Sequence, residues 1–162
     1  MGLMGKITVA ILARALMCAA AAAEDASDEA VIEFRGLVQG GAKVLSRADV
    51  EKLPMQLVTT KTPWHTSVVA FEGVLMRDLL AAVQAKGSKI RVVALNKYAT
   101  EIPIKDFTDY GAILAYKRDG KYMPVRDKGP FFIVYPYDSD VALQSEKFYV
   151  RSAWQVATIT VE

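Results

Sequence analysis

The sequence predicts a single α+β domain made of mixed short-strand sheets with one or two main helices. Apolar residues gather in many short runs, and turn-forming residues such as Gly, Pro, Asn and Asp separate these runs. Only residues 74–85 show a sustained helical repeat. A doubly wound fold would alternate strands with longer helices, and the chain does not show that alternation.

The first elements are two strands with a short helix between them. Residues 31–38 alternate between apolar and polar side chains, which is typical of a strand with one buried face. Ser46 is suited to cap a helix over residues 46–52, because its hydroxyl can accept from a free amide of the first turn. Pro54 ends that helix, and residues 55–60 are expected to form the next strand.

The strongest helix prediction covers residues 74–85. Four apolar side chains recur there at spacings of three to five residues, so they share one face of a helix. A glycine follows and is suited to end the helix. The four side chains and the glycine are Leu75, Leu79, Leu80, Val83 and Gly87.

The second half of the chain is expected to be rich in strands. Asp119-Gly120 stands between two apolar runs and is a strong hairpin signal. Residues 104–107 are expected to form a short helix or a turn. The expected strands are residues 90–95, 112–116, 122–125, 131–135 and 156–161.

The first 23 residues have the composition of a secretory signal peptide. Lys6 supplies a positive charge, residues 7–18 are mostly apolar, and alanines fill residues 19–23 before the acidic Glu24. A charged start, an apolar stretch and a small-residue cleavage site in this order are typical of export signals. We therefore expect a periplasmic protein with a flexible acidic lead-in at residues 24–30.

Two alternatives concern this N-terminal segment. Arg14 interrupts the apolar stretch, and an uncleaved membrane anchor is possible, although the stretch is short for a span of about 20 residues. Cys18 would suit a lipoprotein signal, but the bulky Met17 precedes it. Insertion into the membrane after cleavage is not expected.

Removal of residues 1–23 changes the charge and the cysteine content. The 20 basic residues lose Lys6 and Arg14, which leaves 18 against 18 acidic residues. A neutral domain has no electrostatic footprint for nucleic acid. Cys18 is the only cysteine, so the processed chain has no disulfide and no thiolate metal ligand. About 139 residues remain, which suits one domain.

Several short motifs follow one another over roughly residues 53–161. Each motif is weak alone, but their order and spacing are more specific. They are Phe71-Glu72-Gly73-Val74-Leu75-Met76-Arg77-Asp78-Leu79-Leu80, Asn96-Lys97-Tyr98, Ile102-Pro103-Ile104, Ile113-Leu114-Ala115-Tyr116, Asp119-Gly120-Lys121-Tyr122-Met123-Pro124, Lys128-Gly129-Pro130, Tyr135-Pro136 and Trp154.

In this order the motifs resemble the molybdopterin-binding domain of the sulfite oxidase superfamily. The resemblance implies a sulfite-oxidase-like fold over residues 31–162 that binds a pterin. Catalytic members hold molybdenum through a cysteine thiolate a few residues before a tryptophan. Here Thr59 or Thr60 stands at about that position, ahead of Trp64. A hard, weakly acidic hydroxyl cannot replace a soft thiolate, so no molybdenum is expected.

A narrower resemblance points to a binding protein. Thr62-Pro63-Trp64, Asn96-Lys97-Tyr98, the run from Val125 to Pro130 and Arg151-Ser152-Ala153-Trp154 are similar to segments of periplasmic pterin-binding proteins. That group is associated with inner-membrane cyclic-di-GMP signalling enzymes. The resemblance implies a non-catalytic sensor that binds a free pterin, reduced or oxidised, and reports to the periplasmic domain of such an enzyme.

The residue chemistry suits this ligand. A pterin is a flat aromatic bicycle with one hydrogen-bonding edge, so its site needs stacking faces, a few polar groups and apolar walls. Asn96 can donate and accept, and Asp127 can accept from the exocyclic amine and a ring N–H. The ligand-binding candidates are Trp64, Asn96, Tyr98, Arg126, Asp127, Lys128, Tyr135, Arg151 and Trp154.

Each candidate has a purely structural interpretation. Trp154 and Tyr135 can be core residues, and residues 126–128 can form a solvated turn. His65 is the only histidine, and one imidazole cannot build a metal site alone, so we expect a surface or hydrogen-bonded histidine and no metal.

The sequence is compatible with three classes of function. A ligand-binding sensor agrees best with the cysteine content and the aromatic candidates. A molybdopterin-dependent oxidoreductase would need an unusual metal ligand. A ligand-free interaction domain of the same fold would use the aromatic residues only for packing.

Overall fold

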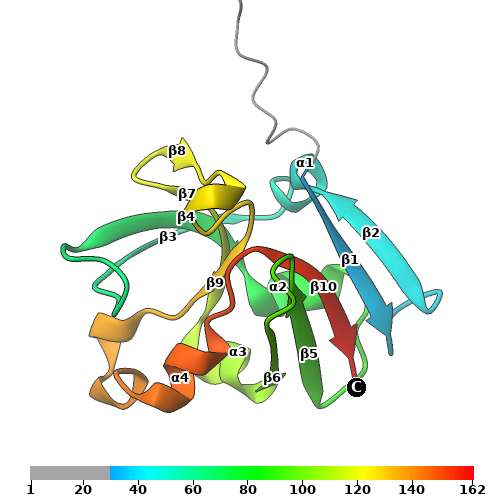
Figure 1. Cartoon of the computed structure of the whole chain (residues 1–162). Coiled ribbons are helices and arrows are strands. Elements are labelled where there is room, and N and C mark those ends of the chain that lie inside the picture. The colour runs from blue at the N-terminus through cyan, green and yellow to red at the C-terminus, as the bar shows by residue number, and fades with distance from the viewer. Residues whose placement is uncertain (1–29) are drawn as a thin grey trace, which may run out of the picture.

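The computed structural model describes residues 30–162 of the chain. The expected signal peptide at residues 1–23 and nearly all of the lead-in at residues 24–30 lie outside the described residues. In the described part, no helix combines the length and the hydrophobicity that crossing a membrane requires. Two five-stranded sheets with short helices confirm the α+β prediction (Figure 1).

The first sheet has the strand order β2-β1-β10-β5-β6. Its β1 and β10 pair in parallel, and the other pairs are antiparallel. On β1, Ile32 and Phe34 are buried while Val31 is exposed, as the two-residue period of a strand requires. The strands are β1 (Val31–Gly36), β2 (Ala42–Ser46), β5 (Lys89–Ala94), β6 (Ala99–Pro103) and β10 (Val156–Val161).

The second sheet has the order β3-β4-β7-β8, and β9 also pairs with β7. Asp119 and Gly120 connect β7 to β8 with φ angles of 49° and 77°, so the predicted hairpin is confirmed. The strands are β3 (Met55–Thr60), β4 (Val69–Leu75), β7 (Ile113–Arg118), β8 (Lys121–Tyr122) and β9 (Phe132–Val134).

The helices of residues 30–162 are short. Ser46 caps α1 as predicted: its hydroxyl accepts from the Asp49 amide at 3.1 Å, and the Asp49 carboxylate accepts from the Ser46 amide. Figure 1 shows α3 and α4 together near the end of β6. The elements are α1 (Arg47–Val50), α2 (Met76–Ala82), α3 (Lys105–Tyr110), α4 (Glu146–Arg151), and the 3-10 turns η1 (Val125–Asp127), η2 (Tyr137–Ser139) and η3 (Val141–Leu143).

The two sheets meet where β9 lies beside the segment that leads into β10. Phe132 and Trp154 form an isolated antiparallel bridge. The Ile133 amide donates to the Ala153 carbonyl at 2.9 Å, and the Val156 amide donates to the Phe131 carbonyl at 3.0 Å. This junction brings the Trp154 segment to the centre of the fold.

Some predicted boundaries were wrong. Val74 and Leu75 end β4, where Val74 is buried opposite Leu114, so the helix begins at Met76 and ends at Ala82. Residues 122–125 do not form one strand, because β8 ends at Tyr122 and η1 follows. Three strands and one helix were not predicted, namely β2, β4, β6 and α4.

Candidate functional site

A cavity of about 260 Å³ brings several of the predicted ligand-binding residues together. It opens between the β5–β6 turn, helix α4 and the segment before β10. We call it the aromatic cavity, because four of its seven lining side chains are aromatic. The lining residues are Trp64, Asn96, Tyr98, Tyr149, Val150, Ser152 and Trp154.

Trp64 is the centre of the aromatic packing around this cavity. Its ring makes edge-to-face contacts with Trp154 at 5.4 Å, Phe132 at 5.7 Å and Tyr149 at 6.1 Å between centroids. The planes of the two indoles lie 73° apart. A flat ring stacked on one indole would therefore be steeply inclined to the other, which is the edge-to-face orientation that aromatic groups favour.

The β5–β6 turn presents Asn96 and Tyr98. The Asn96 Oδ1 accepts from the Tyr98 amide at 3.0 Å, and Lys97 between them has a left-handed φ of 68°. This turn occupies only the oxygen of the Asn96 amide. Among residues 30–162 the amide nitrogen donates to no acceptor, and both Asn96 and Tyr98 are exposed. Asn96 can therefore donate to a ligand without breaking its own turn.

The hydroxyl group of Ser152 in the aromatic cavity already has hydrogen-bond partners within the protein. The buried Ser152 hydroxyl donates to the Phe148 carbonyl at 2.8 Å and shares a short hydrogen bond with the Tyr137 hydroxyl. Burial raises the pKa of Tyr137 well above its ordinary value, so its hydroxyl stays protonated. Ser152 contributes shape and polarity here rather than a free hydroxyl.

Lys128 adjoins the cavity without lining it, and Arg126 is not among the lining residues. The Lys128 ammonium lies 5.2 Å from the ring centroid of Trp154, which is within the range of a cation–π contact. Arg126 is exposed on η1. Lys128 can therefore reach a ligand from the side of this cavity.

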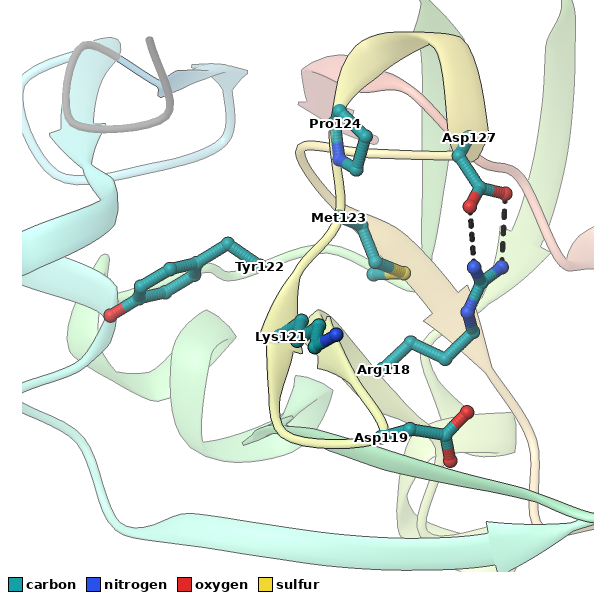
Figure 2. A pocket seen from close by; sticks show the side chains of 7 residues that line it. All are labelled: Arg118, Asp119, Lys121, Tyr122, Met123, Pro124 and Asp127. Atoms are coloured by element: carbon teal, nitrogen blue, oxygen red, sulfur yellow. Dashed lines mark hydrogen bonds and ion pairs between the residues drawn. The ribbon is translucent and has the colours of Figure 1, made fainter. Parts of the chain in front are cut away.

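The structure places Asp127 in an ion pair. Arg118 Nη1 donates to Asp127 Oδ1 at 2.9 Å, and its Nη2 makes a short bond to Oδ2. The hydrogen bond from Arg118 holds the pKa of Asp127 below its ordinary value. Figure 2 shows the pair side by side in a different cavity of about 370 Å³, beside the β7–β8 hairpin. Asp127 is therefore not brought to the aromatic cavity.

His65 lies behind this ion pair and is hydrogen-bonded through both ring nitrogens. Arg118 Nη1 lies 3.2 Å from His65 Nε2, and His65 Nδ1 lies 2.6 Å from the Thr62 hydroxyl. Because a guanidinium only donates, Nε2 accepts and Nδ1 carries the proton. Burial and the nearby Arg118 lower the pKa of His65. The expectation of a hydrogen-bonded histidine is confirmed.

Tyr135 and Arg151 also lie outside the aromatic cavity. Both contact the buried Asp106, with the Tyr135 hydroxyl donating at 3.0 Å and Arg151 Nη1 donating at 2.7 Å. Tyr135 has no exposed surface, and burial raises its pKa well above the ordinary value. The structure thus gives these two candidates a role in joining α3, β9 and α4.

Tyr149, Val150 and Ser152 line the cavity but were not among the candidates. Tyr149 and Val150 lie on α4, a six-residue helix whose length is too short to give a periodic signal. The neighbouring Trp154 was the one available hint. Their place in the cavity depends on the packing of α4 against β6, which the sequence alone does not show.

The position expected for a metal-binding thiolate is occupied by a buried hydroxyl. Thr60 is fully buried, accepts from the Asp138 amide at 3.1 Å and donates to the Lys61 carbonyl at 3.2 Å. Within residues 30–162 there is no group of three or more His, Cys, Asp or Glu side chains that could hold a metal ion. The Thr60 hydroxyl is a hard, weakly acidic donor and does not fit molybdenum as a thiolate would.

Comparison with protein families agrees with this fold. A family model described as the oxidoreductase molybdopterin binding domain matches residues 42–139, well over half of the chain. The matched part includes Trp64, Asn96 and Tyr98. A search of curated proteins finds no significant match. The chain belongs to the oxidoreductase molybdopterin binding domain family.

Proposed function

We propose that the domain binds a pterin ring in the aromatic cavity and acts as a binding protein rather than an oxidoreductase. The observation that carries this proposal is the meeting of the Trp64 and Trp154 indoles with the Asn96 amide around one cavity. Family membership supports the same class of ligand, because the family model describes a molybdopterin-binding domain.

The size and lining of the aromatic cavity suit a small flat ring. Its volume of about 260 Å³ lies just below the range of roughly 300–1,000 Å³ that drug-sized ligands occupy. The indoles offer stacking surfaces, and the Asn96 amide nitrogen offers a donor to a ring carbonyl or ring nitrogen. These features favour a bicyclic heterocycle over a long dinucleotide.

A binding role, without redox chemistry, is supported by the donor atoms. The only cysteine, Cys18, lies outside the described residues and outside the matched segment. The Thr60 hydroxyl is committed to Lys61 and to Asp138. When bound, molybdenum would supply two-electron chemistry in this family, and no residue of this cavity offers the thiolate that holds it.

We further propose that the bound pterin is a signal. The resemblance to periplasmic pterin-binding proteins supports export and a partner in the inner membrane that makes or degrades cyclic-di-GMP. For such a signal the partner must bind the loaded and empty protein with different affinity. The pterin can be reduced or oxidised.

A titration tests the binding proposal on the full-length protein. The chain has two tryptophans, and both line the cavity, so quenching of their emission reports on its occupancy. An oxidised and a reduced pterin are each titrated. We expect saturable quenching at one site by at least one of them.

The same titration of an Asn96→Asp variant tests whether the Asn96 side-chain amide donates to the ligand. Aspartate keeps the oxygen that accepts from the Tyr98 amide but loses the amide donors, so the turn is retained while a ligand contact is lost. We expect about three- to tenfold weaker binding, the loss of one hydrogen bond. The matched control is Gln39→Glu, the same amide-to-acid change at an exposed position elsewhere. Absence of saturable quenching in the wild type would overturn the proposal.

A further inference from the structure

Besides helix α4 and the β3–β4 loop that carries Trp64, three separate loops form or flank the aromatic cavity. The β5–β6 turn carries Asn96 and Tyr98, the segment before β10 carries Trp154, and the loop around η1 carries Lys128. Loops far apart in sequence hold a site only if something fixes them to one another, because a displacement of about 1 Å can spoil a binding geometry.

One residue joins all three loops. The backbone amide of Gln155 donates to the Lys128 carbonyl at 3.2 Å, and the backbone carbonyl of Gln155 accepts from the Leu95 amide at 2.9 Å. The Gln155 side chain donates from Nε2 to the Val125 carbonyl at 2.7 Å. Gln155 directly follows Trp154, so these bonds also set the position of that indole.

The backbone of Gln155 is held in an unfavourable region. Its φ is 55°, a backbone angle that residues other than Gly, Asn and Asp rarely adopt. Lys97 and Lys128, in the two neighbouring loops, have φ angles of 68° and 67°. Strained backbone persists only where surrounding structure enforces it, and it gathers at binding sites. Three of the five non-glycine residues with positive φ among residues 30–162 lie around this cavity.

We propose that Gln155 is a positioning residue of the aromatic cavity, whose side-chain amide ties the η1 loop to the Trp154 segment and thereby sets pterin affinity. This inference rests on the proposed function. Gln155 does not line the cavity, so it acts through Trp154, Lys128 and the β5–β6 turn.

The test compares two matched substitutions in the full-length protein. Gln155→Met keeps the length of the side chain and removes its donor without adding charge. Gln84→Met makes the same change at a φ of 52° in a groove on another part of the surface. Gln155→Asn is the second variant, because asparagine tolerates left-handed backbone but is one methylene too short to reach Val125.

Two measurements separate positioning from general destabilisation. Pterin titration is expected to show about three- to tenfold weaker binding for both Gln155 variants and unchanged binding for Gln84→Met. Hydrogen exchange is expected to be faster in residues 124–129 of Gln155→Met and unchanged there in Gln84→Met. A merely structural role would instead lower the unfolding temperature without a local change in exchange.

The outcomes distinguish this inference from the proposed function. Wild-type binding together with unchanged affinity of both Gln155 variants overturns the role of Gln155 and leaves the proposed function intact. A wild type that binds no pterin overturns the proposed function. In that case unchanged exchange in residues 124–129 of Gln155→Met also overturns the coupling of the loops.

Discussion

The Tyr98 hydroxyl donates to the Val150 carbonyl at 2.6 Å, across one side of the aromatic cavity. Tyr98 lies on the β5–β6 turn and Val150 on α4, so the bond joins two cavity walls that are 52 residues apart in sequence. Tyr98 is 43% exposed, and this bond fixes the end of its side chain against α4. The bond holds the ring as a wall of the cavity.

Substitution of Tyr98 separates the hydroxyl from the ring. Tyr98→Phe keeps the ring and should weaken pterin binding by about 0.5–1.5 kcal/mol, the net value of one hydrogen bond. Tyr98→Ala should cost about 1–3 kcal/mol if the ring stacks on the ligand. Calorimetric titration measures both values, and wild-type affinity in both folded variants would remove Tyr98 from the site.

Trp154→Ala tests the second aromatic face. Loss of the indole should weaken pterin binding by about 1–3 kcal/mol, the range for stacking of a base on an aromatic side chain. Tyr122→Ala is the control, because Tyr122 lies on β8 and lines the separate cavity of Figure 2. Equal affinity of the Trp154 and Tyr122 variants would show that the ring does not stack on Trp154.

Tyr135 and Arg151 should affect stability and leave ligand affinity unchanged. Tyr135→Phe removes a buried hydrogen bond to the Asp106 carboxylate and should lower the free energy of unfolding by about 1.5–3 kcal/mol. Asp106→Asn removes the charge that faces Arg151 and should cost about 3 kcal/mol, the lower end for a broken buried pair. Urea unfolding and pterin titration are measured in parallel. A variant with wild-type free energy of unfolding but weakened pterin binding would instead indicate that Tyr135 and Arg151 belong to the ligand site.

His65 makes stability depend on pH. Burial, Arg118 and Lys128 lower its folded-state pKa below the ordinary 6.5, while Asp127 and Asp119 oppose the shift. The unfolded chain therefore binds the proton more readily, and the stabilisation is complete above pH 6.5 and falls as the pH drops through the lowered pKa. Asp127, with its own lowered pKa, acts only at more acidic pH.

Urea unfolding from about pH 8 to about pH 5 measures this effect. His65→Gln keeps a side chain that can bond to Thr62 and Arg118 but cannot titrate. Wild type should lose stability relative to His65→Gln as the pH falls across this range. Parallel curves for the two proteins would show that His65 does not titrate in this way.

The strands that the sequence predicted well are those whose pattern is local. Residues 55–60 and 156–161 were predicted with their observed bounds, because β-branched and apolar residues dominate both runs. The β4 strand was missed because Leu75 ends it while also matching the spacing of Leu79 in the following helix. The β2 strand was not predicted because it is a short edge strand with an exposed Val44.

The candidate site was predictable only in part. Trp64, Asn96, Tyr98 and Trp154 gather as the motifs suggested. Tyr135, Arg151 and Asp127 do not gather there, because each has a partner on a distant element, Asp106 for the first two and Arg118 for the third. The polar and aromatic residue types of a ligand site are visible in the sequence, but these long-range pairs are not.

Native mass spectrometry with metal analysis of the full-length protein, purified from the periplasm of a Gram-negative host, tests whether the domain binds a pterin without a metal. We expect a bound small pterin and no molybdenum. A protein loaded with molybdenum and a phosphorylated pterin would contradict this expectation and identify an oxidoreductase. An empty protein that also ignores added pterins would contradict it in favour of a ligand-free interaction domain.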